Sequence, residues 1–215
     1  MNTKHNIVRV IKSLVRCLPF YLFTFLLLLS ACSEENEAGT EYANWQARNS
    51  TFWNSLYAQA RDSVAAGSAN WKIIKGWSLE DSLNTGNTSY IIVQVLRHGT
   101  GRGCPLYTDS VRVHYTGRLM PSDSYADGYQ FDSSYGNATS ELTAMPAKFY
   151  VGSLVDGFAT AVQHMHIGDR WKVYVPAELG YRSTAQNAIP AYSTLVFDVA
   201  LVSYYRKGTS VPDYK

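Results

Sequence analysis

Hydrophobic and polar residues alternate with a period of two along much of the second half of the chain, a pattern that predicts β-strands. In the stretch VRVHYTGRL, residues 111–119, the side chains of Val111, Val113 and Tyr115 share one face, and His114 lies on the other. This stretch is expected to be a half-buried strand whose tyrosine faces the core. Further strands are predicted within WKIIKGWSL and SYIIVQVLRHG, and at residues 147–151, 170–176 and 194–202.

Two segments show the three- and four-residue spacing of amphipathic helices. The longer one runs from about residue 41 to 66 and ends at Gly67; its apolar stripe consists of Trp45, Phe52, Trp53, Leu56, Ala60 and Val64. The stripe is expected to pack on the following domain, although a partner-binding helix would show the same pattern. The shorter segment lies near residues 157–164, and long polar loops separate Met120 from Met145.

The first 31 residues have the composition of an export signal. They contain four basic residues and no acidic one, followed by 14 mostly apolar residues from Leu18 to Ala31. This run is short for a membrane span and suits a signal peptide. Its ending, LSAC, resembles the bacterial lipoprotein signal, in which the cysteine, here Cys32, is lipidated and becomes the first mature residue. An ordinary cleavage site or an uncleaved anchor is the alternative. The SEENE that follows resembles the acidic signal of some surface-exposed Bacteroidetes lipoproteins.

The net charge and the cysteine content argue against three kinds of site: a nucleic-acid interface, a disulfide and a metal site. The whole chain has a net charge of +2, but removing the four basic residues of the leader leaves 15 basic against 17 acidic residues, a net charge of −2. The chain without its leader therefore lacks the excess of positive charge that is typical of nucleic-acid-binding proteins. Cys17 leaves with the leader and Cys32 takes the lipid, so Cys104 has no partner for a disulfide or a metal cage. His164 and His166 flank Met165 and are expected to be solvated rather than to bind metal.

Several short signatures follow one another in the region from about residue 88 to 205. They are VHYTG (113–117), FDSS (131–134), AKFYVG (147–152), LVDGF (154–158), MHIGDRWKVYVP (165–176), ELGY (178–181) and IPAYSTLVFDVAL (189–201). In this order they resemble the FKBP-type peptidyl-prolyl cis-trans isomerases, the immunophilins.

The resemblance implies an α+β fold, in which a bent antiparallel sheet wraps around one short helix, with an N-terminal helical extension. It also implies an apolar pocket between sheet and helix. The residues assigned to catalysis are Tyr115, Asp132, Tyr181 and Phe197, with Asp132 at the rim. The residues assigned to substrate binding are Phe131, Phe149, Leu154, Val155, Phe158 and Ile189, with Phe158 as the floor. No metal or other cofactor is implied.

Three positions depart from the family pattern. Phe158 stands where the family usually has tryptophan, Ala147 stands where a pocket phenylalanine is frequent, and Arg182 follows Tyr181 where glycine is common. These changes alter the volume and the border of the pocket. The sequence therefore leaves two hypotheses: an active isomerase, and an FKBP-fold protein of weak or no activity that binds peptides or a partner.

The chemistry of X–Pro isomerisation explains why a pocket of aromatic residues is enough for catalysis. Rotation about an X–Pro bond meets a barrier of roughly 18–20 kcal/mol because amide resonance is lost in the twisted state. No proton moves and no covalent bond breaks. Resonance separates charge, so a dry apolar pocket disfavours the planar imide relative to the twisted one. A hydroxyl such as that of Tyr181 can orient the carbonyl, and His114, on the other strand face, is not needed.

The expected organisation has five parts. They are a lipoprotein signal peptide (1–31), an acidic tether (32–40), a helical extension with a short strand (41–87), an FKBP-type domain (88–207) and a tail (208–215). Residues 89–206 are expected to contain every strand of the sheet and to fold alone, with the helix docking through Trp45, Phe52 and Leu56. The expected partners are proline-containing polypeptides and, through Cys32, a membrane. The protein is expected to be a monomer in the cell envelope, on the periplasmic or external face of the outer membrane, assisting the folding of exported proteins.

Overall fold

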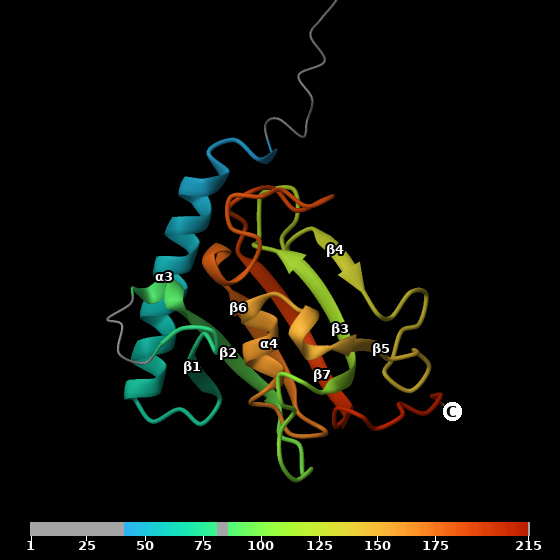
Figure 1. The fold of residues 1–215 in the computed structure, drawn as a ribbon. Coiled ribbons are helices and arrows are strands. Elements are labelled where there is room, and N and C mark those ends of the chain that lie inside the picture. Colours follow the sequence, from blue (N-terminus) through green and yellow to red (C-terminus); the bar gives the residue numbers. More distant parts are fainter. Residues whose placement is uncertain (1–40, 81–85, 215) are drawn as a thin grey trace, which may run out of the picture. The chain divides into compact units, whose positions relative to one another are not determined.

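An antiparallel sheet forms the centre of the protein (Figure 1). The computed structural model describes residues 41–80 and 86–214, so the expectations for the leader, Cys32 and the acidic tether lie outside it. Along the sheet the strands run in the order β1-β2-β6-β7-β3-β4, and β5 also pairs with β3. Their bounds are Trp71–Lys75 (β1), Tyr90–Arg97 (β2), Ser110–Leu119 (β3), Gln130–Ser133 (β4), Ala147–Tyr150 (β5), Arg170–Val175 (β6) and Leu195–Tyr205 (β7).

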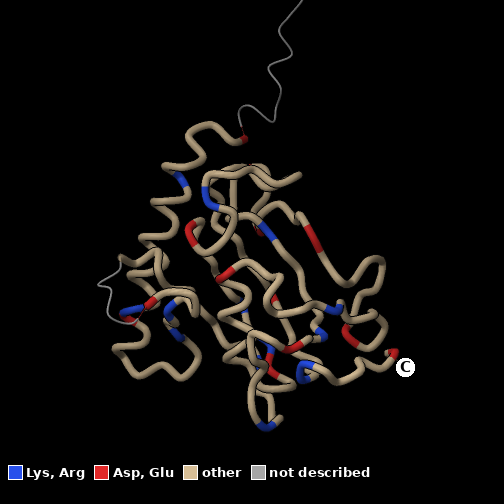
Figure 2. Tube along the Cα trace, in the orientation of Figure 1, with Lys and Arg blue, Asp and Glu red and all other residues tan. Residues whose placement is uncertain are grey.

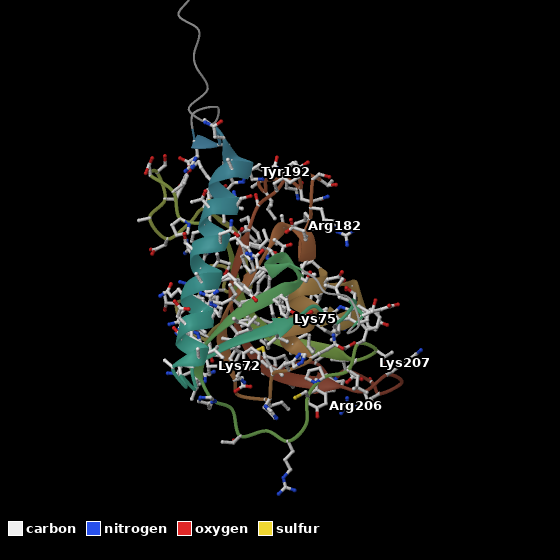
Figure 3. The ribbon with its side chains drawn as sticks, turned by 90° about the vertical axis from the view of Figure 1, so that its left-hand side faces the viewer. Lys72, Lys75, Arg182, Tyr192, Arg206 and Lys207 are labelled. Carbon is white, nitrogen blue, oxygen red and sulfur yellow. The ribbon has the colours of Figure 1, made fainter. Side chains whose placement is uncertain are left out.

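Two α-helices lie on opposite faces of this sheet. The short helix α4, Asp156–Val162, packs on the inner face, and the long helix α3, Trp45–Ala65, runs along the outer face (Figures 1 and 3). Short 3-10 turns lie at Asn87–Ser89 (η1), Val151–Ser153 (η2) and Ala177–Leu179 (η3). The α+β class and the antiparallel sheet around one short helix are therefore confirmed.

Helix α3 packs through the stripe that the sequence predicts. Trp53, Leu56 and Ala60 form one apolar cluster with residues of β2, β6 and β7, whereas Trp45 joins the main core. Val64, which was expected in the stripe, is 42% exposed because it lies in the last turn, beyond the contact with the sheet. Across residues 41–80 and 86–214, the structure contains no helix with the length and apolar character needed to span a bilayer.

The expectation that residues 89–206 contain every strand is wrong. Strand β1 pairs with β2 in register from Trp71 opposite Gln94 to Lys75 opposite Tyr90, so the sheet begins at Trp71. The sequence predicts a strand within WKIIKGWSL but not its partner, because β1 has only five residues and all of them are half-buried, so no clear buried face marks it as part of the sheet. Whether residues 89–206 fold alone stays a prediction.

Strand β3 is buried on both faces, not on one. Its inner face carries Val111, Val113 and Tyr115 as expected, yet His114 on the outer face is only 2% exposed. The ring of Tyr135, in the loop between β4 and β5, stacks on His114 at 5.6 Å. Arg112 on the same face is covered by the C-terminal tail, where it donates to the carbonyl of Pro212.

Charged side chains of both signs are interspersed along the trace (Figure 2). Several of them form ion pairs close to the outer face of β3 and its neighbours. Arg170 binds both carboxylate oxygens of Asp198 at 2.8 Å, and Arg97 contacts Glu141 at 2.9 Å. The first pair joins β6 to β7, whereas the contact of Arg97 with Glu141, and a second contact of Arg170 with Glu141 at 3.6 Å, hold the loop that contains Glu141 against the sheet.

Candidate active site

A cluster of aromatic rings fills the space between α4 and the inner face of the sheet. The ring of Phe158 lies at its centre, with its centroid 4.8 Å from Phe197, 6.0 Å from Tyr115 and 6.5 Å from Phe149. Phe131 contacts Phe197 at 5.8 Å. All of these pairs meet edge to face, which is a favoured geometry for aromatic rings. The floor and the walls that the sequence predicts are therefore adjacent in space.

Five different elements supply these rings. Tyr115 comes from β3, Phe131 from β4, Phe149 from β5 and Phe197 from β7, all on the inner side, whereas Phe158 comes from α4. Strand alternation places each of the four strand residues on the face that contacts the helix. The site therefore depends on the whole sheet and not on one local motif.

Two glycines allow the rings to approach one another. A Cβ atom at Gly117 would lie 2.5 Å from the ring of Phe131 and 3.0 Å from that of Phe197. A Cβ atom at Gly157 would lie 2.3 Å from Cγ1 of Val175 on β6. Gly117 thus leaves room for the aromatic walls, and Gly157 lets α4 come close enough to bring Phe158 into the cluster. Gly117 lies within the VHYTG signature, but its role follows from packing, which sequence reasoning missed.

Tyr115 and Asp132 are joined at the rim. The hydroxyl of Tyr115 donates to one carboxylate oxygen of Asp132, and the backbone N–H of Ser133 donates to the other at 2.8 Å. Burial first, and then the hydrogen bond to Asp132, raise the pKa of the Tyr115 hydroxyl far above its usual range. This hydroxyl therefore stays protonated at physiological pH and donates to Asp132, and its ring belongs to the aromatic cluster.

The remaining predicted residues lie around this cluster. Ile189 is 6% exposed and belongs to the same core, and Leu154 and Val155, just before α4, are half-buried against it. Tyr181 is 37% exposed, and its charge interaction with the Tyr115 hydroxyl contributes weakly to the raised pKa of Tyr115. It therefore stands at the open side of the cluster, where a ligand could reach its hydroxyl.

The other candidate groups lie outside this site. His114 faces away from the rings, as expected, and burial lowers the pKa of its imidazole. His164 and His166 are exposed, and Nε2 of His166 lies 3.8 Å from the sulfur of Cys104. Burial, and then the charge of Asp169, raise the pKa of the Cys104 thiol. Within residues 41–80 and 86–214, no group of three His, Cys, Asp or Glu residues could hold a metal ion.

Comparison with known proteins finds similarity to one family. Residues 104–202 match the sequence model of the FKBP-type peptidyl-prolyl cis-trans isomerase family. The chain is 39% identical over 110 residues to the FKBP-type 22 kDa peptidyl-prolyl cis-trans isomerase of Escherichia coli, which covers 51% of this chain and 47% of that protein. It is 37% identical over 116 residues to the macrophage infectivity potentiator of Trypanosoma cruzi, which covers 54% and 53%.

These matches cover the strands and the short helix that carry the aromatic cluster. Residues 104–202 are similar to an FKBP-type peptidyl-prolyl cis-trans isomerase domain. The chain spans about half the length of the two relatives. A solved structure, the peptidyl-prolyl cis-trans isomerase of Pseudomonas syringae pv. tomato, superimposes with a TM-score of 0.47 at 24% identity, over 71% of this chain and 96% of that one.

Proposed function

We propose that this protein is a peptidyl-prolyl cis-trans isomerase that binds an X–Pro segment over the aromatic cluster and stabilises its twisted imide. The observation that carries this proposal is the set of edge-to-face contacts around Phe158, which brings together rings from β3, β5, β7 and α4. A surface of this kind excludes water and can complement the shape of the twisted imide. These two properties are enough to lower the barrier to rotation about the X–Pro bond. The family match supports the same reaction class.

The mechanism follows from the groups that surround the cluster. The planar imide is stabilised by charge separation between its oxygen and nitrogen, which water supports better than an apolar wall does. Contact with Phe158 and Phe197 therefore favours the twisted form relative to the planar form. Tyr181, at the open side, can donate a hydrogen bond to the substrate carbonyl and fix its orientation. Tyr115 and Asp132 hold each other and so shape the rim.

The alternative is an FKBP-fold protein that binds peptides without accelerating exchange. The smaller ring of Phe158 at the floor and the small side chain of Ala147 opposite Val113 on β3 favour it, because both reduce the aromatic surface that contacts the imide. Both hypotheses predict binding of proline-containing peptides, and they differ in catalysis alone.

Exchange measurements on X–Pro peptides test the proposal. With the full-length protein we expect cis–trans exchange to accelerate in an NMR exchange or protease-coupled assay, in proportion to enzyme concentration. The matched control is Leu106→Ala, a substitution at a side chain that is 55% exposed and not part of the aromatic cluster, which should leave the rate unchanged. Peptide binding with an exchange rate equal to that of free peptide would establish the alternative.

We further propose that the protein is an exported lipoprotein of the cell envelope, anchored through Cys32, where it assists the folding of exported polypeptides. The proposal rests on the basic start, the short apolar run and the LSAC ending. A diacylated cysteine gives stable membrane attachment, since two chains bind far more firmly than one. Mass spectrometry of the mature amino terminus is expected to find Cys32 carrying lipid. An unlipidated terminus at another residue would contradict this prediction.

A further inference from the structure

The loop of residues 181–193 adopts an unusual backbone conformation. Three of its non-glycine residues have positive φ: Arg182 at 56°, Asn187 at 44° and Tyr192 at 61°. L-residues adopt this region rarely because the Cβ atom approaches the carbonyl oxygen. Such strain persists where the surroundings determine the conformation, and it is concentrated at functional sites. This loop carries Tyr181 at its start and Ile189 near its tip, so the strain lies beside the aromatic cluster.

Hydrogen bonds within the loop close its tip and its base. At the tip, Gln186 and Ile189 exchange backbone hydrogen bonds of 2.9 and 2.7 Å. At the base, the N–H of Tyr192 donates to the carbonyl of Arg182 at 2.7 Å. Figure 3 shows Tyr192 beside the N-terminal end of α3 and Arg182 further from the helix. The loop is thus an internally closed unit whose position depends on what holds its base.

The first turns of α3 hold that base through buried side chains. The indole N–H of Trp45 donates to Oγ of Ser193 at 2.8 Å, and this hydroxyl donates to the carbonyl of Pro190 at 2.6 Å. The side-chain oxygen of Asn49 accepts the backbone N–H of Thr194 at 2.7 Å. Trp45 and Asn49 are 6% and 3% exposed, and Ser193 and Thr194 are buried as well.

The amide of Asn49 is fixed in one orientation. Its nitrogen donates to the carbonyl of Trp45 at 2.8 Å while its oxygen accepts from Thr194. A flipped amide would place two donors, or two acceptors, against each other at both ends. Buried polar groups that lose their partner carry a large desolvation penalty. The interaction between α3 and the base of the loop is therefore specific in geometry, unlike the apolar packing further along the helix.

We propose that Trp45 and Asn49 are positioning residues of the isomerase site: they hold the strained loop so that Tyr181 stays at the open side of the aromatic cluster and Ile189 stays packed beside it. This inference rests on the proposed function. Thr194 directly precedes β7, the strand that carries Phe197, so the same contacts join the helix to the loop and to a wall of the site. The helical extension thereby acts on substrate binding and does more than cover the sheet.

The consequence is a specific kinetic signature. A loop that leaves its binding conformation lowers the fraction of protein competent to bind, and the apparent affinity falls by that fraction. The chemical step on a bound substrate, which depends on Phe158 and Phe197, is unchanged. Loss of the contacts should therefore raise KM and leave kcat nearly constant. A purely structural role for α3 would lower the melting temperature without changing KM.

Two substitutions in the full-length protein test this. Asn49→Leu keeps the side-chain volume but removes the acceptor for Thr194, and Trp45→Phe keeps an aromatic ring but removes the donor to Ser193. Because each removes one hydrogen bond, we expect KM for X–Pro peptides to rise by about 3- to 10-fold with kcat within about twofold of the original. Trp45→Phe keeps the test decisive if Asn49→Leu does not fold.

The matched control is Leu56→Ala on the same helix. Leu56 is 8% exposed and packs on Ile92, Tyr174 and Val196 of the sheet, not on the loop. This substitution should lower the melting temperature at least as much as Asn49→Leu does, with KM unchanged. An equal increase in KM for Leu56→Ala, or an unchanged KM for folded Asn49→Leu and Trp45→Phe, would overturn the proposal.

Hydrogen exchange gives a second measurement that does not depend on activity. In the native protein the amides of Ile189 and Thr194 are hydrogen-bonded, and we expect Asn49→Leu to accelerate their exchange by at least about tenfold, an effect that Leu56→Ala should lack. If the native protein does not catalyse isomerisation but this exchange pattern is found, the proposed function fails while the restraint of the loop by α3 stands. Unchanged exchange at both amides in Asn49→Leu would show that α3 does not restrain the loop.

Discussion

Phe197→Ala is expected to lower kcat/KM for X–Pro isomerisation by about 30-fold or more. This factor corresponds to a loss of about 2 kcal/mol of contact with the twisted imide, less than the about 3–5 kcal/mol that truncating a buried phenylalanine costs in folding stability. The ring of Phe197 is 6% exposed and contacts both Phe158 and Phe131. Its removal opens the cluster to water and deletes a wall. Tyr181→Phe, by contrast, removes one hydrogen bond of about 0.5–1.5 kcal/mol and should cost about two- to twelvefold.

The control for this comparison lies on the same strand. Leu201 of β7 is 1% exposed and belongs to the main core, but it pairs with Val113, away from the rings of Phe131 and Phe197. Leu201→Ala should destabilise the fold and leave the rate per folded molecule nearly unchanged. Rates are measured at a temperature where circular dichroism shows each variant to be folded. A loss of rate for Leu201→Ala that equals that for Phe197→Ala, or a larger loss for Tyr181→Phe, would contradict a site based on shape.

The strand pattern of the sequence predicts much of the sheet, because a period of two is a local property. Residues 111–119 alternate as expected, and the inner-face residues of β3 reach the core. The site residues could be assigned through the family resemblance, and the rings of Tyr115, Phe131, Phe149, Phe158 and Phe197 do meet in space. The roles of these residues in catalysis stay predictions until they are measured.

The features that the sequence does not predict are all long-range. Trp45 and Ser193 are 148 residues apart, and Asn49 and Thr194 are 145 apart, so no local periodicity can indicate that they meet. The helical pattern of the sequence predicts only that Trp45 belongs to the apolar face of the helix and that Asn49 is exposed to solvent. Likewise, His114 looks exposed when β3 is considered alone, and it becomes buried because the loop with Tyr135 folds over it.

The burial of His114 makes the stability of the fold depend on pH. Burial lowers the pKa of its imidazole, and the weaker opposing influence of Glu141 does not reverse the direction. Within the described part of the chain, Nδ1 of His114 is buried without a hydrogen-bond partner. Below the ordinary histidine pKa of about 6.5, the unfolded chain therefore binds a proton that the folded protein does not bind. The free energy of unfolding should fall as the pH drops from 7.5 to 5.5, with a slope of up to about 1.4 kcal/mol per pH unit from this one group.

Urea unfolding at pH 7.5, 6.5 and 5.5 measures this dependence, and His114→Phe is the matched variant. Phenylalanine keeps a ring that can stack on Tyr135 but does not titrate, so its free energy of unfolding should vary less over this range. The two proteins differ at this position alone, so the difference between the two curves isolates His114. The isomerisation rate, in contrast, should depend little on pH between pH 6 and 8 in both proteins, because His114 lies on the face of β3 away from the rings. A steep pH dependence of the rate that disappears in His114→Phe would show that the histidine takes part in the chemistry. An equal pH dependence of the free energy of unfolding in the two proteins would show that the burial of His114 does not cause this dependence.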